Sequence, residues 1–227
     1  MTVIIEKNEK ENVEAQMNAT GNNVTEVVFI LDRSGSMDPL TDDTIGGFNS
    51  LLKKQKEEEG DAIVTTVLFD DQYEVLHNGI DIKKVEEITR KEYFARGCTA
   101  LLDAVGKTLT DIDRRYNDLP AALVPARTMV VIITDGYENA SREFSNDAIR
   151  KMVEQRKERG WEFIFLGANI DSFAAAKSLG ISRDRAANFK ANARGVGECY
   201  EAVGEVMYCF RECKDISEDW GRKLEEE

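Results

Sequence analysis

A group of oxygen-bearing side chains follows the first strongly apolar run of the sequence. In the segment 32–36, the residues Asp32, Ser34 and Ser36 alternate with Arg33 and Gly35, and glycine at position 35 allows a tight turn there. Carboxylate and hydroxyl oxygens are the ligand atoms that hard divalent cations such as Mg²⁺ and Mn²⁺ prefer. The alternation therefore predicts part of a metal site.

Two more oxygen-bearing residues stand at similar places later in the chain. Asp135 follows the apolar run 129–133, and Thr99 precedes a segment with the apolar spacing of a helix. In open α/β sheets, ligands bind at the carboxyl ends of neighbouring strands, where the winding direction reverses. We therefore expect five oxygen ligands to converge there, leaving a sixth coordination position for a carboxylate from outside: Asp32, Ser34, Ser36, Thr99 and Asp135.

The elements that must position these residues are indicated by the apolar pattern. Unbroken apolar runs at 27–31 and 129–133 predict strands that are buried on both faces of a parallel sheet. The run at 163–166 predicts another buried strand, and 63–69 and 73–76 predict a hairpin that makes the sheet mixed. Helices are predicted at 41–60, 101–112, 144–158, 172–178 and 196–214, with short edge strands at 3–5 and 187–190.

This alternation of strands and helices predicts one α/β domain with helices on both faces of a mostly parallel sheet. We expect the domain to span residues 24–215, because polar residues dominate before it and acidic residues after it. Residues 1–23 are predicted to form a polar N-terminal arm, and residues 216–227 an acidic C-terminal tail.

The motifs together resemble those of the von Willebrand factor A domain family. Its metal-ion-dependent adhesion site consists of Asp-x-Ser-x-Ser, a distant Thr and a distant Asp, which segment 32–36, Thr99 and Asp135 match in the right order. Where many members carry Gly-Gly-Thr, this chain has a cysteine, Cys98, before the threonine. The resemblance covers residues 25–214. It implies a Rossmann-like, doubly wound sheet with one antiparallel edge strand, a bound Mg²⁺, and protein recognition in place of catalysis.

Composition excludes several classes of partner. The net charge of -13, from 43 acidic and 30 basic residues, argues against a surface for nucleic acid or anionic membranes. No apolar run approaches the ~20 residues of a membrane-spanning helix, and no secretory signal is visible. The four cysteines show no paired framework, which fits reduced thiols. We expect a cytoplasmic protein of bacterial or phage type, monomeric outside its complex.

Charged and polar residues around the motif have more ordinary interpretations. Thr99 is also suited to cap a helix, and several acids near the motif are expected to form a solvated rim, namely Asp38, Asp42, Asp43 and Glu138. Since the chain is strongly acidic, an acidic partner would need local positive charge besides the cation. We expect a basic rim made of Arg33, Arg96 and Arg142.

The main alternative is a metal-dependent hydrolase or phosphatase that uses the same crevice. Phosphatases of the haloacid dehalogenase type also begin with an Asp after the first strand, but they need a second acid where this chain has Ser34. A Ser-His-Asp hydrolase would have to use His77, the single histidine, without a Gly-x-Ser-x-Gly turn. A scaffold with an incidental metal site is a third interpretation. The sequence favours a binding module, not an enzyme, that captures an Asp or Glu of an unidentified protein through Mg²⁺ or Mn²⁺.

Overall fold

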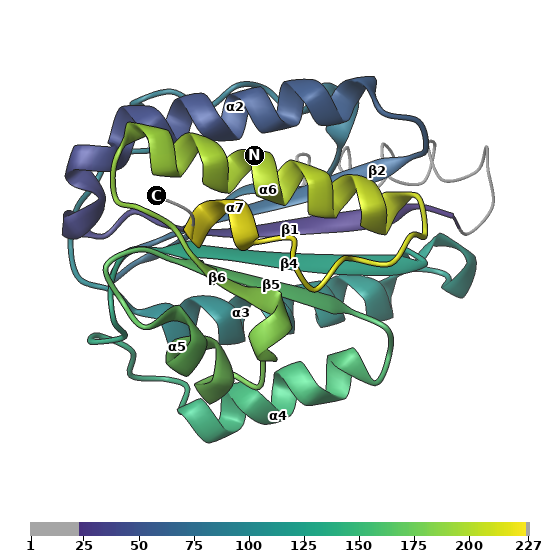
Figure 1. Ribbon diagram of the computed structural model, residues 1–227. Coiled ribbons are helices and arrows are strands. Elements are labelled where there is room, and N and C mark those ends of the chain that lie inside the picture. Colours follow the sequence, from purple (N-terminus) through teal and green to yellow (C-terminus); the bar gives the residue numbers. More distant parts are fainter. Residues whose placement is uncertain (1–22, 226–227) are drawn as a thin grey trace.

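The computed structural model describes residues 23–225, which form a mixed sheet between two layers of helices (Figure 1). The strands follow the order β3-β2-β1-β4-β5-β6, and neighbouring strands are parallel except β2 and β3. This confirms the predicted fold class, including the antiparallel edge strand; the strand expected at 3–5 lies outside the described residues. The strands are β1 (Thr25–Asp32), β2 (Ala62–Phe69), β3 (Tyr73–Asp81), β4 (Arg127–Thr134), β5 (Glu162–Gly167) and β6 (Ala186–Asn188).

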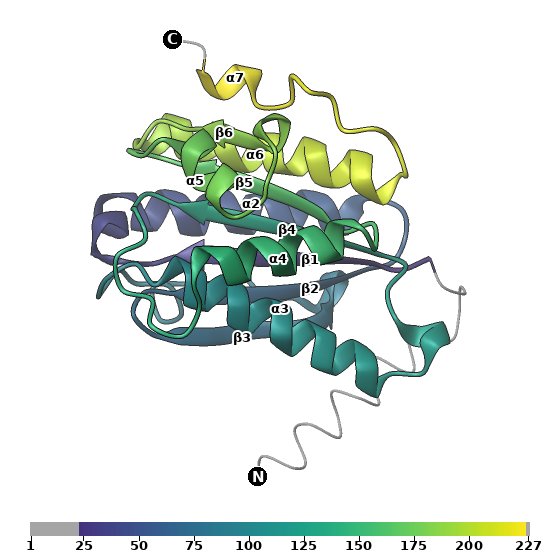
Figure 2. The ribbon, with the colours of Figure 1, turned by 90° about the horizontal axis from the view of Figure 1, so that it is seen from below.

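The helices cover both faces of the sheet. Helices α2 (Thr41–Glu57) and α6 (Ala193–Arg211) pack on one face (Figure 1), and α3 (Leu101–Asp118), α4 (Asn146–Lys157) and α5 (Ser172–Ser178) on the other (Figure 2). The short helix α7 (Arg222–Glu225) follows α6, and 3-10 turns lie at Gly35–Leu40, Ile82–Lys84, Ala121–Leu123 and Arg183–Arg185. Within residues 23–225, no helix has both the length and the apolar character needed to cross a bilayer.

Strand β1 is apolar along its centre because it must fill two cores. Val27, Phe29 and Leu31 pack towards α2 and α6, whereas Val28 and Ile30 pack towards the α3 side of the sheet. All eight residues of the strand are buried, since parallel neighbours flank it and helices cover both of its faces. A polar side chain at the end of such a strand is held at the middle of the sheet's carboxyl edge.

The strand register brings the ends of three strands together. Asp32 pairs with Phe69 at the end of β2, and Leu31 pairs with Ile133, next to Thr134 at the end of β4. From β1 the chain continues to β2 on one side and returns to β4 on the other, so the winding direction reverses between β1 and β4. This is the switch point at which open α/β sheets bind ligands.

The segment after α6 returns to the domain. Its acidic composition predicts a tail, but Trp220 and Leu224 are buried in the core next to α6. The Trp220 indole N–H donates to the backbone carbonyl of Asp184 at 2.9 Å. Two apolar residues four positions apart thus attach the described part of this segment to β6 and α6.

Candidate metal site

The carboxylate of Asp32 is buried and held in one orientation. Its side chain ends β1 and is 1% exposed. One carboxylate oxygen accepts the backbone N–H of Ser34 at 2.7 Å, and the other accepts the hydroxyl of Thr134. The Asp32 backbone carbonyl accepts the Tyr93 hydroxyl at 2.5 Å. These contacts fix both the main chain and the carboxylate at the centre of the edge.

A short chain of hydrogen bonds connects the first part of the motif to Asp135. The hydroxyl oxygens of Ser34 and Ser36 are 3.2 Å apart, and the Ser36 hydroxyl donates to Asp135 Oδ1 at 2.5 Å. Asp135 is 4% exposed and directly follows β4. The structure therefore brings together residues that are 99 positions apart in the sequence.

Thr99 reaches the same place through the backbone of Gly136. A Cβ atom on Gly136 would lie 2.9 Å from Thr99 Oγ1 and 3.6 Å from Ser36 Oγ. Because glycine has no such atom, both hydroxyls approach the main chain next to Asp135. The five residues that the sequence selected are thus gathered at one edge of the sheet, and their role as metal ligands stays a prediction.

The loop after Asp135 holds the backbone of Thr99. Asn139 Oδ1 accepts the Thr99 N–H at 2.9 Å, and the Thr99 carbonyl accepts the N–H groups of Asn139 at 3.0 Å and Ala140 at 3.2 Å. The positive φ of 66° in this segment falls on Gly97, so Cys98 needs no strained conformation. Thr99 does not cap α3. The N-cap residue is Ala100, whose side chain cannot accept a hydrogen bond from the helix.

Glu138 stabilises the start of α3 from a different loop. Its carboxylate accepts the backbone N–H of Leu102 at 2.9 Å, together with the N–H groups of Ala140 at 2.9 Å and Ser141 at 2.7 Å. A carboxylate is well suited to the positive end of a helix dipole. The expectation that Glu138 belongs to a solvated rim is therefore wrong, and the sequence contains no signal that separates it from an ordinary loop acid.

The expected basic rim is wrong for Arg33. This arginine is 0% exposed, and its guanidinium pairs with Asp70 at 3.0 Å and Glu74 at 2.8 Å. Arg96 is partly buried and also pairs with Asp70, at 2.7 Å. Arg33 thus connects the turn after β1 to the hairpin of β2 and β3, and Arg96 connects the loop before Thr99 to the same hairpin. Of the three expected residues, Arg142 is exposed.

The electrostatics of the site are those of two carboxylates without a counter-ion. Burial, with a smaller contribution from the nearby Asp135, raises the pKa of Asp32 to about 6, although hydrogen bonds from Thr134 and Ser34 oppose the shift. Burial also raises the pKa of Asp135. Among the described residues, no lysine or arginine forms an ion pair with either carboxylate. A bound cation would stabilise both charges.

The donor set fits a hard cation. All five side chains offer oxygen, which suits Mg²⁺ or Mn²⁺ better than softer metals. Within residues 23–225, no group of three His, Cys, Asp or Glu side chains gathers as a metal cluster. A metal at this edge would therefore depend on ligands other than carboxylates, and the hydroxyls of Ser34, Ser36 and Thr99 are the candidates that the sequence predicts.

Comparison with known proteins gives likeness in structure only. No family model and no curated protein sequence matches the chain. A von Willebrand factor type A structure from Catenulispora acidiphila superimposes with a TM-score of 0.54 and 18% identity, over 79% of this chain and 42% of that one. The fold is that of von Willebrand factor A domains.

Two metal-bearing structures share this fold. Proximal thread matrix protein 1 from the mussel byssus, with a zinc-occupied MIDAS motif, gives a TM-score of 0.57 and 15% identity over 81% of this chain and 46% of that one. Manganese-loaded TRAP protein from Plasmodium vivax gives 0.56 and 19% over 76% and 70%. This chain spans less than half of the bacterial and mussel chains. The bound zinc and manganese are features of those two structures.

Proposed function

We propose that this chain is a metal-dependent protein-binding module, which captures an acidic side chain of a partner protein through Mg²⁺ or Mn²⁺. The ligands would be the five residues named above. The observation that carries the proposal is the pair of buried carboxylates, Asp32 and Asp135, which share an edge with three hydroxyls and form no ion pair with a lysine or arginine of residues 23–225. A bound cation would supply positive charge and a coordination position for an outside carboxylate. The metal-bearing neighbours of the same fold support this choice.

The proposed ligands are of two kinds, charged carboxylates and neutral hydroxyls. Asp32 and Asp135 would balance the charge of a divalent ion, whereas Ser34, Ser36 and Thr99 would add neutral ligands. With only two carboxylates in the set, the site keeps attraction for a third one from outside. Thr134 and the Ser34 N–H already hold the Asp32 carboxylate in place, so little ordering would accompany binding.

No observation favours the hydrolase alternative. His77 is 8% exposed and pairs with Thr66, before β2 reaches the edge at which Phe69 pairs with Asp32, so it lies away from the candidate metal site. Ser34 occupies the position at which a dehalogenase-type phosphatase needs its second acid. We therefore propose a binding module and not an enzyme. The net charge of -13 supports a protein partner over nucleic acid or an anionic membrane, and we propose a cytoplasmic chain that is monomeric outside its complex.

Metal binding is tested first with Mn²⁺ alone. Free Mn²⁺ is measured by electron paramagnetic resonance during titration of the full chain, and Mg²⁺ is added as competitor. We expect one site in the wild type, and a loss of at least about 100-fold in affinity in Asp32→Ala and Asp135→Ala. Asp38→Ala removes an exposed acid beside the motif and is the matched control, which should keep full affinity. An equal loss in the control would contradict the assignment of ligands.

The partner is tested by pull-down from a cell lysate in Mg²⁺ or in EDTA, with the wild type and Asp32→Ala. We expect proteins that are captured only by the wild type and only in Mg²⁺. Their capture should be restored when Mn²⁺ replaces Mg²⁺, since both ions accept the same oxygen ligands. If the same proteins are captured in EDTA as in Mg²⁺, or by Asp32→Ala as by the wild type, a metal bridge is ruled out.

A further inference from the structure

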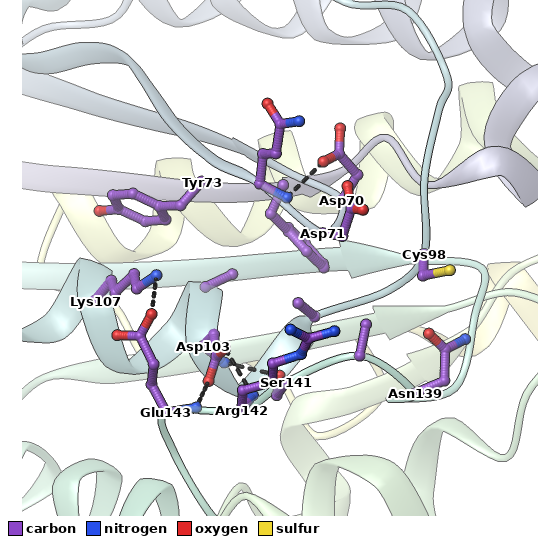
Figure 3. A pocket seen from close by; sticks show the side chains of 15 residues that line it. Asp70, Asp71, Tyr73, Cys98, Asp103, Lys107, Asn139, Ser141, Arg142 and Glu143 are labelled. Carbon is purple, nitrogen blue, oxygen red and sulfur yellow. Dashed lines mark hydrogen bonds and ion pairs between the residues drawn. The ribbon is translucent and has the colours of Figure 1, made fainter.

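A groove of about 520 Å³ opens beside the candidate metal site (Figure 3). One wall is the turn 69–73 between β2 and β3, and the other is the loop 139–143 after β4. Cys98 and Ala100, which flank Thr99 in the sequence, also line the groove. The groove therefore begins where the candidate metal site ends, and a segment bound at the metal would extend into it.

The walls of the groove are held by contacts within the domain. The carboxylate of Asp103 accepts three backbone N–H groups of 142–144 at 2.8 to 2.9 Å. Lys107 pairs with Glu143 at 2.7 Å, and Asp70 is bound by two arginines. Three of the acids that line the groove are thus already satisfied, and the loop that forms one wall is fixed to α3.

Arg142 differs from the other arginines of the described chain. Its guanidinium reaches into the groove from the loop wall (Figure 3) and forms no hydrogen bond, ion pair or ring contact. Every other arginine between residues 23 and 225 forms at least one such interaction. In a chain with 43 acidic and 30 basic residues, acidic partners are abundant. An arginine without one is available for a ligand.

We propose that Arg142 binds a second carboxylate of the partner, so that the module recognises a segment with two acidic residues. One acid would occupy the metal site, and the other would enter the groove. This inference rests on the proposed function. A guanidinium suits the task because it binds a carboxylate through two parallel hydrogen bonds. Asp71 lies on the opposite wall (Figure 3) and repels a carboxylate, which directs the second acid towards Arg142.

The test uses the full chain and synthetic peptides in Mg²⁺. One peptide carries a single Glu in an Ala-Gly-Ser background, and a series carries a second Glu one to four residues away on either side. Binding is followed by NMR titration. We expect at least one spacing to bind about tenfold more tightly than the single-Glu peptide, which is the contribution of one charge-assisted pair. Arg142→Gln should abolish this gain and leave the single-Glu affinity unchanged.

Two further variants sharpen the test. Asp71→Asn should increase the affinity for the two-acid peptide, because it removes the repulsion across the groove. Arg150→Gln, which removes an exposed arginine from α4 outside the groove, is the matched control and should change nothing. Arg142→Gln should keep its Mn²⁺ affinity and its fold, because the Arg142 side chain forms no hydrogen bond, ion pair or ring contact within residues 23–225.

The outcomes separate this inference from the proposed function. If the preference for two acids survives Arg142→Gln, or if no spacing exceeds the single acid, the role of Arg142 is overturned while the metal site stands. If no peptide binds more tightly in Mg²⁺ than in EDTA, the proposed function itself fails, and the inference fails with it.

Discussion

Strand β1 carries a buried carboxylate near each end, and the two are stabilised in opposite ways. Glu26 is 0% exposed, forms an ion pair with Arg115, and accepts the hydroxyls of Thr65 and Tyr116, each at 2.6 Å. Asp32 is 1% exposed and has hydrogen bonds but no cationic partner within the described chain. The charge of the first is balanced inside the fold, whereas that of the second is not.

This difference is the one that we expect between a carboxylate that stabilises the fold and a carboxylate that binds a cation. Burial alone does not, because both side chains are fully enclosed. A buried charge is costly unless it is paired, so the chain keeps Asp32 at the expense of its own stability. Sites of this kind are where stability and function oppose each other. An external cation is the simplest partner that would make the two ends of β1 equivalent.

The largest expected effect is at the paired end. Arg115→Met leaves the Glu26 carboxylate buried without a counter-ion, so we expect the free energy of unfolding to fall by about 3–5 kcal/mol. Urea denaturation measures this change. The double variant Glu26→Leu with Arg115→Met should recover most of the loss, because it buries no unpaired charge. An Arg115→Met variant as stable as the wild type would remove the basis of the comparison.

His77 extends the comparison to a buried base, for which residues 23–225 provide no hydrogen-bond partner at Nδ1. Burial, together with the nearby Lys56, lowers its pKa from the ordinary value of 6.5 to about 4. Between these pH values the unfolded chain binds more protons at His77 than the folded chain does. The free energy of unfolding therefore decreases as the pH falls from 6.5 to 4. The loss should reach about 3 kcal/mol. In urea denaturation at pH 7 and 4.5, His77→Gln should lose less stability than the wild type; an equal loss would contradict the prediction.

At the unpaired end, we expect removal of the charge to increase the stability of the metal-free protein. Asp32→Asn keeps the shape of the side chain and an acceptor for the Ser34 N–H, but removes a buried charge near Asp135. We expect the metal-free variant to be about 1 kcal/mol more stable than the wild type at pH 8. Mg²⁺ should reverse this order, because only the wild type gains from metal binding. Thermal denaturation with EDTA or Mg²⁺ measures both, and Mg²⁺ stabilising the two proteins equally would contradict the assignment.

The smallest effect is expected at the loop that holds Thr99. Asn139→Ala removes the acceptor of the Thr99 N–H, a loss of about 1 kcal/mol, so Mn²⁺ affinity should fall about fivefold. Asn188→Ala breaks a similar bond to the Ser172 N–H at the end of β6 and is the control. Mn²⁺ titration distinguishes them: equal affinities in the two variants would show that Asn139 does not position the site.

The fold was predictable because a strand that is buried on both faces requires an unbroken run of apolar residues, which is visible in the sequence. Strands β1 and β4 must be apolar along their centres, and an acid at the end of β1 or directly after β4 therefore stands out in the sequence. The gathering of Asp32 and Asp135 at one edge followed from this pattern. The charged residues around the site follow no comparable sequence pattern. Arg33 is buried, and Glu138 caps a helix 36 residues before it in the chain, yet a charged residue looks the same in sequence whether it is solvated or bonded across the fold.

The packing of the chain after α6 bears on how copies of this protein meet. Strand β6 is three residues long and is the last strand of the sheet in the described chain, and α7 lies beside it (Figure 2). A Cβ atom on Gly221 would lie 2.7 Å from Ala187 Cβ, so the contact leaves no gap. Unprotected edge strands are where sheets join and aggregate. A protein shortened to end at α6 would lose this cover, and its solubility would depend on that single short strand.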